Sequence, residues 1–544
     1  AGYEARACVR NCGRLGDEDA TAACEEACDA EEGSKTDACS AVLDPAVLGA
    51  SATATRGDDV GSCREAAGDG FATCAADCGD DPLALRCLIT CERTRAADEA
   101  SCGFVAVRES ASVTEVPELA RGAAADLSVL LDDDEIAVVE AADARAEAFR
   151  TRLLRLYLGA PGAEVAITQL EHAFEFGFPV DFREFRDEPE DLEFYRQIAS
   201  DNATLMVAET ALKWRQLEPE PGRLEFDLGD SELAWAEENG FKVKMHTLLW
   251  GNAPPLSTGS GTPQWLREQF PDPDLGEAEK AELRALIRFQ AESIVERYKG
   301  RIDIYDITNE MLNPLTGWFA TRLGPGIVDD LFRWVRAIDP GAQLVMNEWI
   351  DEVFTSLDGP TAADVVNRVF ELQDQGVPID AIGTQAHFIP GILFATDPQL
   401  DDPLLDSRTR IDEYANVLEL LAEPGLPLHM TETTFNTPAD PEERAAQAEA
   451  IMRLWWGTEA VEQVVFWSLW NKVAARNQLE HGIFDSTRDG TLTRHGEAVM
   501  SLINDRWRTR EAITTDADGA AELRVTLGDY VAKWTENGEE KEAR

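Results

Sequence analysis

The stretch Ile304-Tyr-Asp-Ile-Thr-Asn-Glu310 decides the fold of this chain, together with its later counterpart Leu428-His-Met-Thr-Glu432. Each stretch is a short, mainly apolar run that ends in a glutamate, which is typical of a buried strand opening onto a loop. Runs of this kind recur along the chain, and stretches with helical periodicity follow them. The two glutamates therefore belong to one repeated strand–helix pattern.

Strand and helix candidates alternate between about residue 164 and residue 510. The strand candidates are Ala173–Phe178, Leu205–Val207, Val243–Leu248, Ile302–Ile307, Leu344–Met346, Ile382–Gln385, Leu428–Thr431 and Val464–Trp467. The helical candidates include Leu233–Asn239, Glu277–Arg297, Ile327–Ile338, Ala362–Gln375 and Arg410–Leu421. Eight strand–helix repeats predict an α/β fold, in which parallel strands close into a (β/α)8 TIM barrel. Functional residues of such barrels gather where the strands end.

Cysteine usage marks the first domain boundary. All 11 cysteines lie between Cys8 and Cys102, and this density favours disulfides and an oxidising location. Four pairs are spaced four residues apart, which puts each pair on one helix face; they are Cys8/Cys12, Cys24/Cys28, Cys74/Cys78 and Cys87/Cys91. Residues 1–110 are therefore predicted to form a disulfide-rich α-helical domain of two helical hairpins. Zinc binding is the alternative, and the connectivity stays open.

The remaining boundaries follow from composition. Residues 111–138 form a predicted acidic linker that contains Leu130-Leu-Asp-Asp-Asp-Glu135. The barrel domain is placed at residues 139–510, and a helix over Val139–Leu158 is expected to begin it.

Residues 511–544 are predicted to form a β-hairpin tail packed on the barrel. Alternating residues in Ala521–Leu527 indicate one strand, and a turn leads to a second at Tyr530–Trp534. We expect this hairpin to lie beside an extra strand at Glu164–Gln169.

The charge balance narrows the possible partners. The formal net charge is -54, which repels nucleic acid and anionic lipid. No apolar run of about 18 residues is present, so no membrane span is predicted. The chain starts at Ala1 without a methionine, which suggests the mature product of a cleaved precursor. We expect a secreted or cell-surface protein, and the acidic surface is consistent with a saline habitat.

The two glutamates are suited to glycosidic bond cleavage. Glu310 ends the fourth strand candidate and Glu432 follows the seventh, so they face each other across the predicted barrel mouth. A retaining glycosidase uses one carboxyl group as acid/base and a second as nucleophile. Asn309 is placed to bind a sugar hydroxyl.

From about Arg150 to Asn504 the chain resembles glycoside hydrolase family 10, the endo-β-1,4-xylanase family, and most closely its plant-type branch. The segments that carry the resemblance occur in the family's order; they are Lys213–Phe226, Glu238–Trp250, Asp306–Glu310, Gly383–His387, Thr431-Glu432 and Val465–Ser468.

The resemblance implies a role for each matched residue. Glu310 would be the acid/base and Glu432 the nucleophile, which His387 would orient. The expected sugar-binding residues are Glu209, Lys213, His246, Trp250, Asn309, Gln385 and Trp467. No metal and no organic cofactor is implied.

Several positions depart from the family pattern, and none of them is one of the two glutamates expected to cleave the bond. These positions are Thr210, Met245 and Gly251, and also Glu348 within Asn347-Glu348-Trp349, where the family has an N-D-Y turn.

The resemblance implies a retaining endo-β-1,4-xylanase that acts on xylan or a related β-1,4-glycan. Two alternatives stay open, a hydrolase of another β-linked glycan and a non-catalytic carbohydrate-binding relative. The N-terminal domain is interpreted as a tether to a cell surface or a protein partner.

Overall fold

The computed structural model of the chain describes residues 119–251, 261–313, 317–350, 359–388, 409–436, 438–473 and 481–544. The cysteine-rich domain predicted at residues 1–110 lies outside these ranges, so its disulfide-linked hairpins stay a prediction. Within the described ranges, no helix combines the length and the apolar character that a membrane crossing requires.

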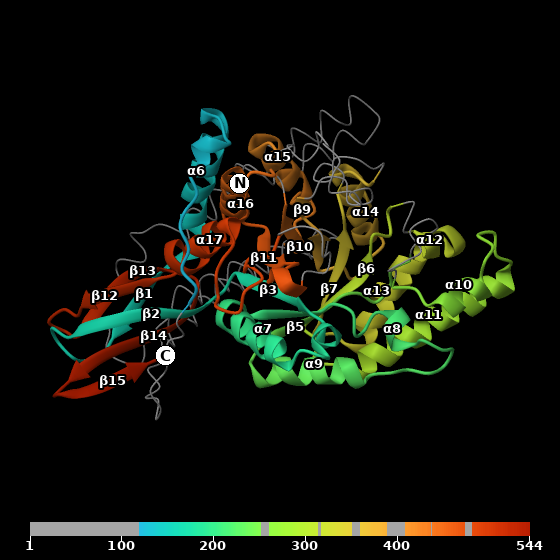
Figure 1. Cartoon of the computed structure of the whole chain (residues 1–544), viewed down its shortest axis with the longest axis horizontal. Coiled ribbons are helices and arrows are strands. Elements are labelled where there is room, and N and C mark those ends of the chain that lie inside the picture. Colours follow the sequence, from blue (N-terminus) through green and yellow to red (C-terminus); the bar gives the residue numbers. More distant parts are fainter. Residues whose placement is uncertain are drawn as a thin grey trace, which may run out of the picture. The chain divides into compact units, whose positions relative to one another are not determined.

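Parallel strands form a closed barrel at the centre of the described chain (Figure 1). In barrel order the strands are β3 (Glu175–Val180), β4 (Leu205–Ala208), β5 (Lys242–Met245), β6 (Ile304–Asn309), β7 (Gln343–Glu348), β8 (Ala381–Thr384), β10 (Leu428–Phe435) and β11 (Val461–Phe466). The barrel closes because β11 pairs with both β10 and β3. This confirms the predicted (β/α)8 barrel, and each of the eight strand candidates overlaps one barrel strand.

Side chains along each strand point alternately into and out of the barrel, so the molecule has an inner core and an outer core. Leu205 and Val207 of β4 contact an inner cluster that also contains Ile304 and Val465. Met206, between them, joins the outer cluster that fills the space between strands and helices. Successive side chains of a strand point to opposite faces, so one short apolar strand supplies both cores.

Helices surround the barrel and cover the outer core (Figure 1). They are α7 (Pro189–Asn202), α8 (Trp214–Leu217), α9 (Asp227–Glu238), α10 (Gln264–Gln269), α11 (Glu277–Tyr298), α12 (Trp318–Leu323), α13 (Gly326–Ile338), α14 (Ala362–Asp374), α15 (Ile411–Leu421), α16 (Pro441–Trp456) and α17 (Arg494–Ser501). In α13 the buried residues Ile327, Leu331 and Val335 are four apart, which places them on one face.

The helix that precedes the barrel differs from its prediction at both ends. Helix α6 spans Asp133–Arg150, not Val139–Leu158. It begins inside the acidic run that was assigned to the linker, because Asp132 and Glu135 form a capping box there. It ends where Thr151–Tyr157 forms strand β1.

Strand β1 pairs with β13 (Ala520–Thr526) in a separate two-stranded sheet. The segments Leu153–Gly159 and Ala520–Leu523 belong to a different compact unit from the barrel. Within that unit Arg155 and Glu522 form an exposed ion pair at 2.9 Å.

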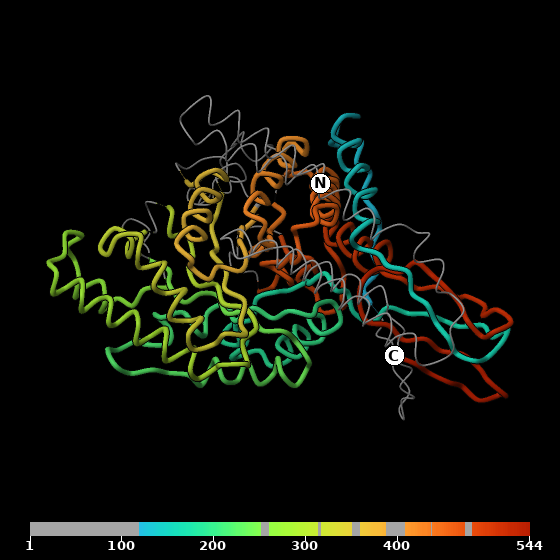
Figure 2. The backbone as a smooth tube through the Cα atoms, turned by 180° about the vertical axis from the view of Figure 1, so that it is seen from behind, coloured from blue at the N-terminus to red at the C-terminus, as the bar shows by residue number. Residues whose placement is uncertain are grey.

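A four-stranded antiparallel sheet joins the start and the end of the larger unit. Strand β2 (Glu164–His172) pairs with β12 (Arg510–Thr514) on one side and with β14 (Gly528–Glu536) on the other. Figure 2 shows the red C-terminal strands beside β2. The extra strand expected at Glu164–Gln169 is thereby confirmed.

The predicted pairing of Ala521–Leu527 with Tyr530–Trp534 is wrong. The hairpin of this region joins β14 to β15 (Glu539–Ala543) instead. Asn537 and Gly538 both have positive φ, of 54° and 84°, as a two-residue type I′ turn requires.

Candidate active site

Side chains at the carboxyl ends of the barrel strands form one contact network. The ten residues singled out from the sequence all lie there; they are Glu209, Lys213, His246, Trp250, Asn309, Glu310, Gln385, His387, Glu432 and Trp467. Six of the eight barrel strands, or the loops directly after them, supply these side chains. Such a rim is where barrel proteins place their functional groups.

Glu432 lies within β10 and is only 5% exposed. Its Oε1 accepts a hydrogen bond from Asn347 Nδ2 at 2.9 Å, and its Oε2 lies 3.2 Å from His387 Nε2. The other ring nitrogen of His387 lies 2.8 Å from Thr434 Oγ1. Strand β9 (His387–Phe388) pairs with the end of β10, which brings His387 and Thr434 together. His387 is therefore fixed on both sides, with one nitrogen directed at Glu432.

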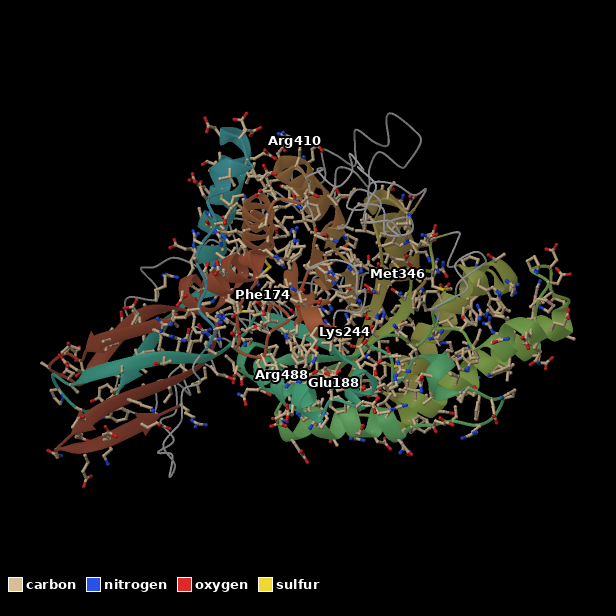
Figure 3. The ribbon with its side chains drawn as sticks, viewed as in Figure 1. Phe174, Glu188, Lys244, Met346, Arg410 and Arg488 are labelled. Carbon is tan, nitrogen blue, oxygen red and sulfur yellow. The ribbon has the colours of Figure 1, made fainter. Side chains whose placement is uncertain are left out.

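His246 follows β5 and approaches Glu432 from the opposite side of the barrel. Its Nε2 lies 3.8 Å from Glu432 Oε1, and its Nδ1 lies 3.0 Å from Asp306 Oδ2. Lys244 Nζ lies 3.0 Å from Asp306 Oδ1, and both partners are about 1% exposed. Figure 3 shows Lys244 among the barrel strands. Because a buried carboxylate needs such partners, Asp306 can hold the His246 ring in one orientation.

These neighbours control the charge of Glu432. Burial alone would raise the pKa of its carboxyl group. The positive fields of His246 and His387, the hydrogen bond from His387 and the charge of Lys213 outweigh burial and lower the pKa to about 2. Glu432 is therefore ionised at neutral pH.

Glu310 follows β6 directly and is partly exposed. Gln385 Nε2 donates to its Oε1 at 2.8 Å, and Asn309 Nδ2 donates to the same oxygen at 3.3 Å. Trp250 Nε1 donates to its Oε2 at 3.2 Å. These three donors are uncharged, so they orient the carboxyl group without adding positive charge.

Two amide side chains connect the surroundings of the two glutamates. Asn347 Nδ2 donates to Glu432 Oε1 and also to Asn309 Oδ1, at 2.9 Å each. Gln385 Nε2 donates to Glu310 and also to Asn309 Oδ1, at 3.2 Å. Asn309 thus lies at the junction, and both carboxyl groups belong to one hydrogen-bonded network.

Lys213 and Glu209 add a pair of opposite charges to the rim. Burial lowers the pKa of Lys213, although the carboxylates of Glu209, Glu432 and Glu310 oppose this shift. Burial raises the pKa of Glu209, and Lys213 opposes that shift. Lys213 Nζ also lies 5.1 Å from the centre of the Trp250 ring, within reach of a cation–π interaction.

Trp467 provides an apolar wall beside the imidazole groups. Its ring centre lies 5.3 Å from that of His246 and 6.5 Å from that of His387, with the rings nearly perpendicular. Trp467 also lines a small pocket together with Glu209; the other lining residues are Pro179, Asp181, Glu184, Phe185, Tyr195, Ser468, Leu469 and Val473. A flat indole face with carboxylates beside it is suited to a sugar ring and its hydroxyl groups.

The sequence reasoning missed three contributors to this site. Asn347 lies between the two glutamates, Asp306 orients His246, and Thr434 orients His387. All three lie in segments adjacent to the predicted residues, and strand pairing explains their positions. Asn347 pairs with Asn309 in the register between β6 and β7.

Gly251, which departs from the family pattern, lies where no larger residue fits. A Cβ atom at this position would lie 2.8 Å from Phe319 and 2.9 Å from Trp318. The first residues of α12 therefore occupy the space that a larger side chain would need.

Among the described residues, no group of three or more histidine, cysteine, aspartate or glutamate side chains is arranged to hold a metal ion. The polar side chains of the rim form hydrogen bonds with one another.

A barrel with two carboxyl groups at its rim is the arrangement that many glycoside hydrolases use. Residues 167–489 match the sequence model of one such family, Glycosyl hydrolase family 10. Since this match covers more than half of the chain, the protein belongs to glycosyl hydrolase family 10, as the sequence motifs indicated.

The chain is similar to relatives that extend well beyond the matched region. The anti-sigma-I factor RsgI6 of Acetivibrio thermocellus is 29% identical over 68% of this chain and 42% of its own length. The endo-1,4-beta-xylanase 1 of Arabidopsis thaliana is 23% identical over 68% of this chain and 34% of its own length. The chain thus spans less than half of either relative, and one is bacterial and one plant.

The fold matches a solved structure. Native xylanase 10B from Thermotoga maritima superposes with a TM-score of 0.50 at 23% identity, over 61% of this chain and 96% of that one. The similarity supports the barrel architecture.

Proposed function

We propose that this protein is a retaining endo-β-1,4-xylanase, with Glu432 as the nucleophile and Glu310 as the acid/base. One observation carries the proposal. Two glutamates share a single hydrogen-bonded network; two imidazole groups lie beside Glu432 and keep it ionised, whereas amide and indole groups donate the described hydrogen bonds to Glu310. Double displacement needs this division between an ionised carboxylate and one that exchanges a proton.

The contacts support a reaction in two steps. In the first, a Glu432 oxygen bonds to the anomeric carbon while Glu310 gives its proton to the departing glycosidic oxygen. Glu432 loses its negative charge in the covalent glycosyl-enzyme. In the second, Glu310 takes a proton from water, whose oxygen replaces Glu432 at the anomeric carbon and restores the carboxylate.

The other rim residues would bind the sugar next to the cleaved bond. Lys213, Asn309 and Gln385 offer hydrogen-bond donors, and Trp250 and Trp467 offer ring faces. His246 and His387 would act on Glu432, and Glu209 would accept hydrogen bonds from hydroxyl groups deeper in the pocket.

The test is the release of reducing ends from glucuronoxylan by wild type and Glu432→Gln, at low and at high salt. We expect release by the wild type and a loss of about 10⁴-fold or more in the variant. Retention of the anomeric configuration, followed by NMR, would support double displacement.

Two alternatives predict other results. If the wild type cleaves another β-linked glycan in a polysaccharide panel but not xylan, the reaction holds and the substrate differs. If it binds glycans but cleaves none, the carbohydrate-binding alternative is correct.

We propose a secreted or cell-surface location, based on the 11 cysteines of residues 1–110. The N-terminal domain would then tether the enzyme to a surface or a protein partner. Thiol titration with and without reductant tests the disulfides on which this proposal depends.

A further inference from the structure

Glu348 is a buried carboxyl group that the proposed reaction does not use. It ends β7 and is fully buried. Its Oε1 accepts hydrogen bonds from the backbone N–H groups of Met311, at 2.8 Å, and Leu312, at 3.2 Å. These are the two residues that directly follow Glu310. Its Oε2 is buried and has no hydrogen-bond partner among the described residues.

The backbone at Glu310 needs such support. Glu310 has a φ of 57°, in the left-handed region that residues with a side chain rarely adopt. Its N–H donates to Asn347 O at 3.0 Å, on the residue before Glu348. The end of β7 therefore holds this turn on both sides of Glu310, through Asn347 O before it and Glu348 Oε1 after it.

A second connection runs through Gln385. The Gln385 N–H donates to Glu348 O at 3.0 Å, and the Gln385 side chain donates to Glu310 Oε1 at 2.8 Å. Glu348 thus contacts both the backbone that carries Glu310 and the residue that orients its carboxyl group.

We propose that Glu348 is a positioning residue for Glu310: its carboxyl group fixes the left-handed turn that aims the Glu310 side chain at the leaving oxygen. This inference rests on the proposed function, since it assigns Glu310 the acid/base role. A misplaced acid loses most of its effect because proton transfer requires hydrogen-bond contact in the transition state.

The same surroundings favour an uncharged Glu348. Burial raises its pKa well above the ordinary value, the Leu312 and Met311 N–H groups oppose this, and the nearby Glu310 adds to it. A neutral acid keeps Oε1 as the acceptor of two N–H bonds. It also favours ionisation of Glu310 in the second step, because a neutral Glu348 adds no negative charge beside it.

The experiment compares Glu348→Gln with Glu348→Met, which have similar volumes but differ in the acceptor oxygen. Two substrates report on the acid. The leaving sugar of xylan needs a proton, whereas the leaving group of a 2,4-dinitrophenyl β-xylobioside departs without one. We expect the methionine variant to lose about 10²-fold in kcat/KM on xylan and less than about fivefold in kcat/KM on the aryl glycoside, because kcat/KM reports the first step, in which Glu310 acts as the acid. We expect the glutamine variant to stay within about threefold of wild type on both.

Glu232 of α9 offers a matched control. It is also fully buried, its Oε1 accepts a backbone N–H bond, from Phe182 at 3.0 Å, and its Oε2 has no described partner. Burial likewise raises its pKa well above the ordinary value. Glu232→Met should lower activity on both substrates in equal proportion, because this bond does not reach Glu310.

Equal losses on both substrates in Glu348→Met would overturn the proposal, and so would a glutamine variant as impaired as the methionine one. If Glu348→Met does not fold, Glu348→Ala replaces it. Amide hydrogen exchange of Met311 and Leu312 tests the positioning itself without any substrate: slow exchange in wild type and Glu348→Gln, and fast exchange in Glu348→Met, is expected. A wild type that cleaves neither substrate would instead refute the proposed function, and unprotected amides in the wild type would refute the positioning role.

Discussion

Strand β10 and the loop directly after β6 each carry one glutamate, and the surroundings of the two side chains differ. Glu432 lies within β10, is almost fully buried and is bordered by His387 and His246. Glu310 lies just past β6, is partly exposed, and accepts hydrogen bonds from amide and indole groups. The same side chain can therefore serve as a fixed anion or as a proton carrier, because its neighbours set the free energy of ionisation.

Removing the acid at the end of β6 should have the largest effect and should depend on the leaving group. Glu310→Gln keeps the volume and removes the proton, so xylan hydrolysis should fall about 10²- to 10⁴-fold. The first step on a 2,4-dinitrophenyl β-xylobioside should be nearly unaffected, which a pre-steady-state burst would reveal. Glu432→Gln is the control, since it should abolish both reactions. If Glu310→Gln and Glu432→Gln had equal effects on both substrates, the two glutamates would not have the separate roles of acid and nucleophile.

Removing one of the imidazole groups beside Glu432 should lower activity less than Glu310→Gln does, and the loss should depend on pH. His387→Gln removes one contributor that opposes burial, so the pKa of Glu432 should rise from about 2. The acid side of the kcat/KM profile should move to higher pH, and kcat should fall about 10- to 100-fold.

His429→Gln is the matched control for this variant. His429 is also a buried imidazole of β10, and burial lowers its pKa well below the ordinary value. The contacts of Glu432 described above do not include it, so its replacement should leave the acid limb in place. An unchanged pH profile of kcat/KM in His387→Gln would contradict the inference that His387 lowers the pKa of Glu432.

The charge of Glu432 should also appear in the stability of the fold. Its pKa is lowered from 4.5 to about 2 on folding, so the stabilising contribution is complete above pH 4.5 and is lost as the pH falls toward 2. The contribution is at most about 3 kcal/mol. The melting temperature of Glu432→Gln should therefore depend less on pH than that of the wild type between pH 4.5 and 2. Parallel curves in calorimetry would argue against the lowered pKa.

The smallest effect should follow from removing one neutral donor at β6. Trp250→Phe deletes the indole bond to Glu310 Oε2 but leaves the Gln385 bond to Oε1. We expect kcat on xylan to fall roughly three- to tenfold, and less on the aryl glycoside. Trp265→Phe, which deletes an indole bond to Glu218 O, should not separate the two substrates.

The barrel could be predicted from the sequence because its strands are short apolar runs separated by helices of ordinary length. The prediction was wrong where the local sequence fits two different secondary structures. Residues 151–157 continue the apolar pattern of α6, yet their strand partner lies in β13, far along the chain. The hairpin was misplaced because alternation in Ala521–Leu527 outweighed the Asn537-Gly538 turn signal.

The sequence predicted the residues proposed to contact the substrate more fully than the residues that support them. Glu310 and Glu432 end recognisable stretches, whereas Asn347 and Glu348 act through the pairing of β7 with its neighbours. A hydrogen bond between adjacent strands depends on their register, which composition and spacing along one strand do not reveal.

The pairing of β2 has a consequence for how the chain folds during synthesis. Gln169, in β2, donates to Leu527 O across a separation of 358 residues, and Gln463 of β11 reaches back 288 residues to Glu175 of β3. Both edges of β2 therefore stay unpaired until β12 and β14 leave the ribosome, and the barrel stays open until β11 appears. Over that interval β2 presents unpaired N–H and C=O groups to any other nascent chain. Strands β12 and β14 thus protect the two edges that β2 exposes until they are made.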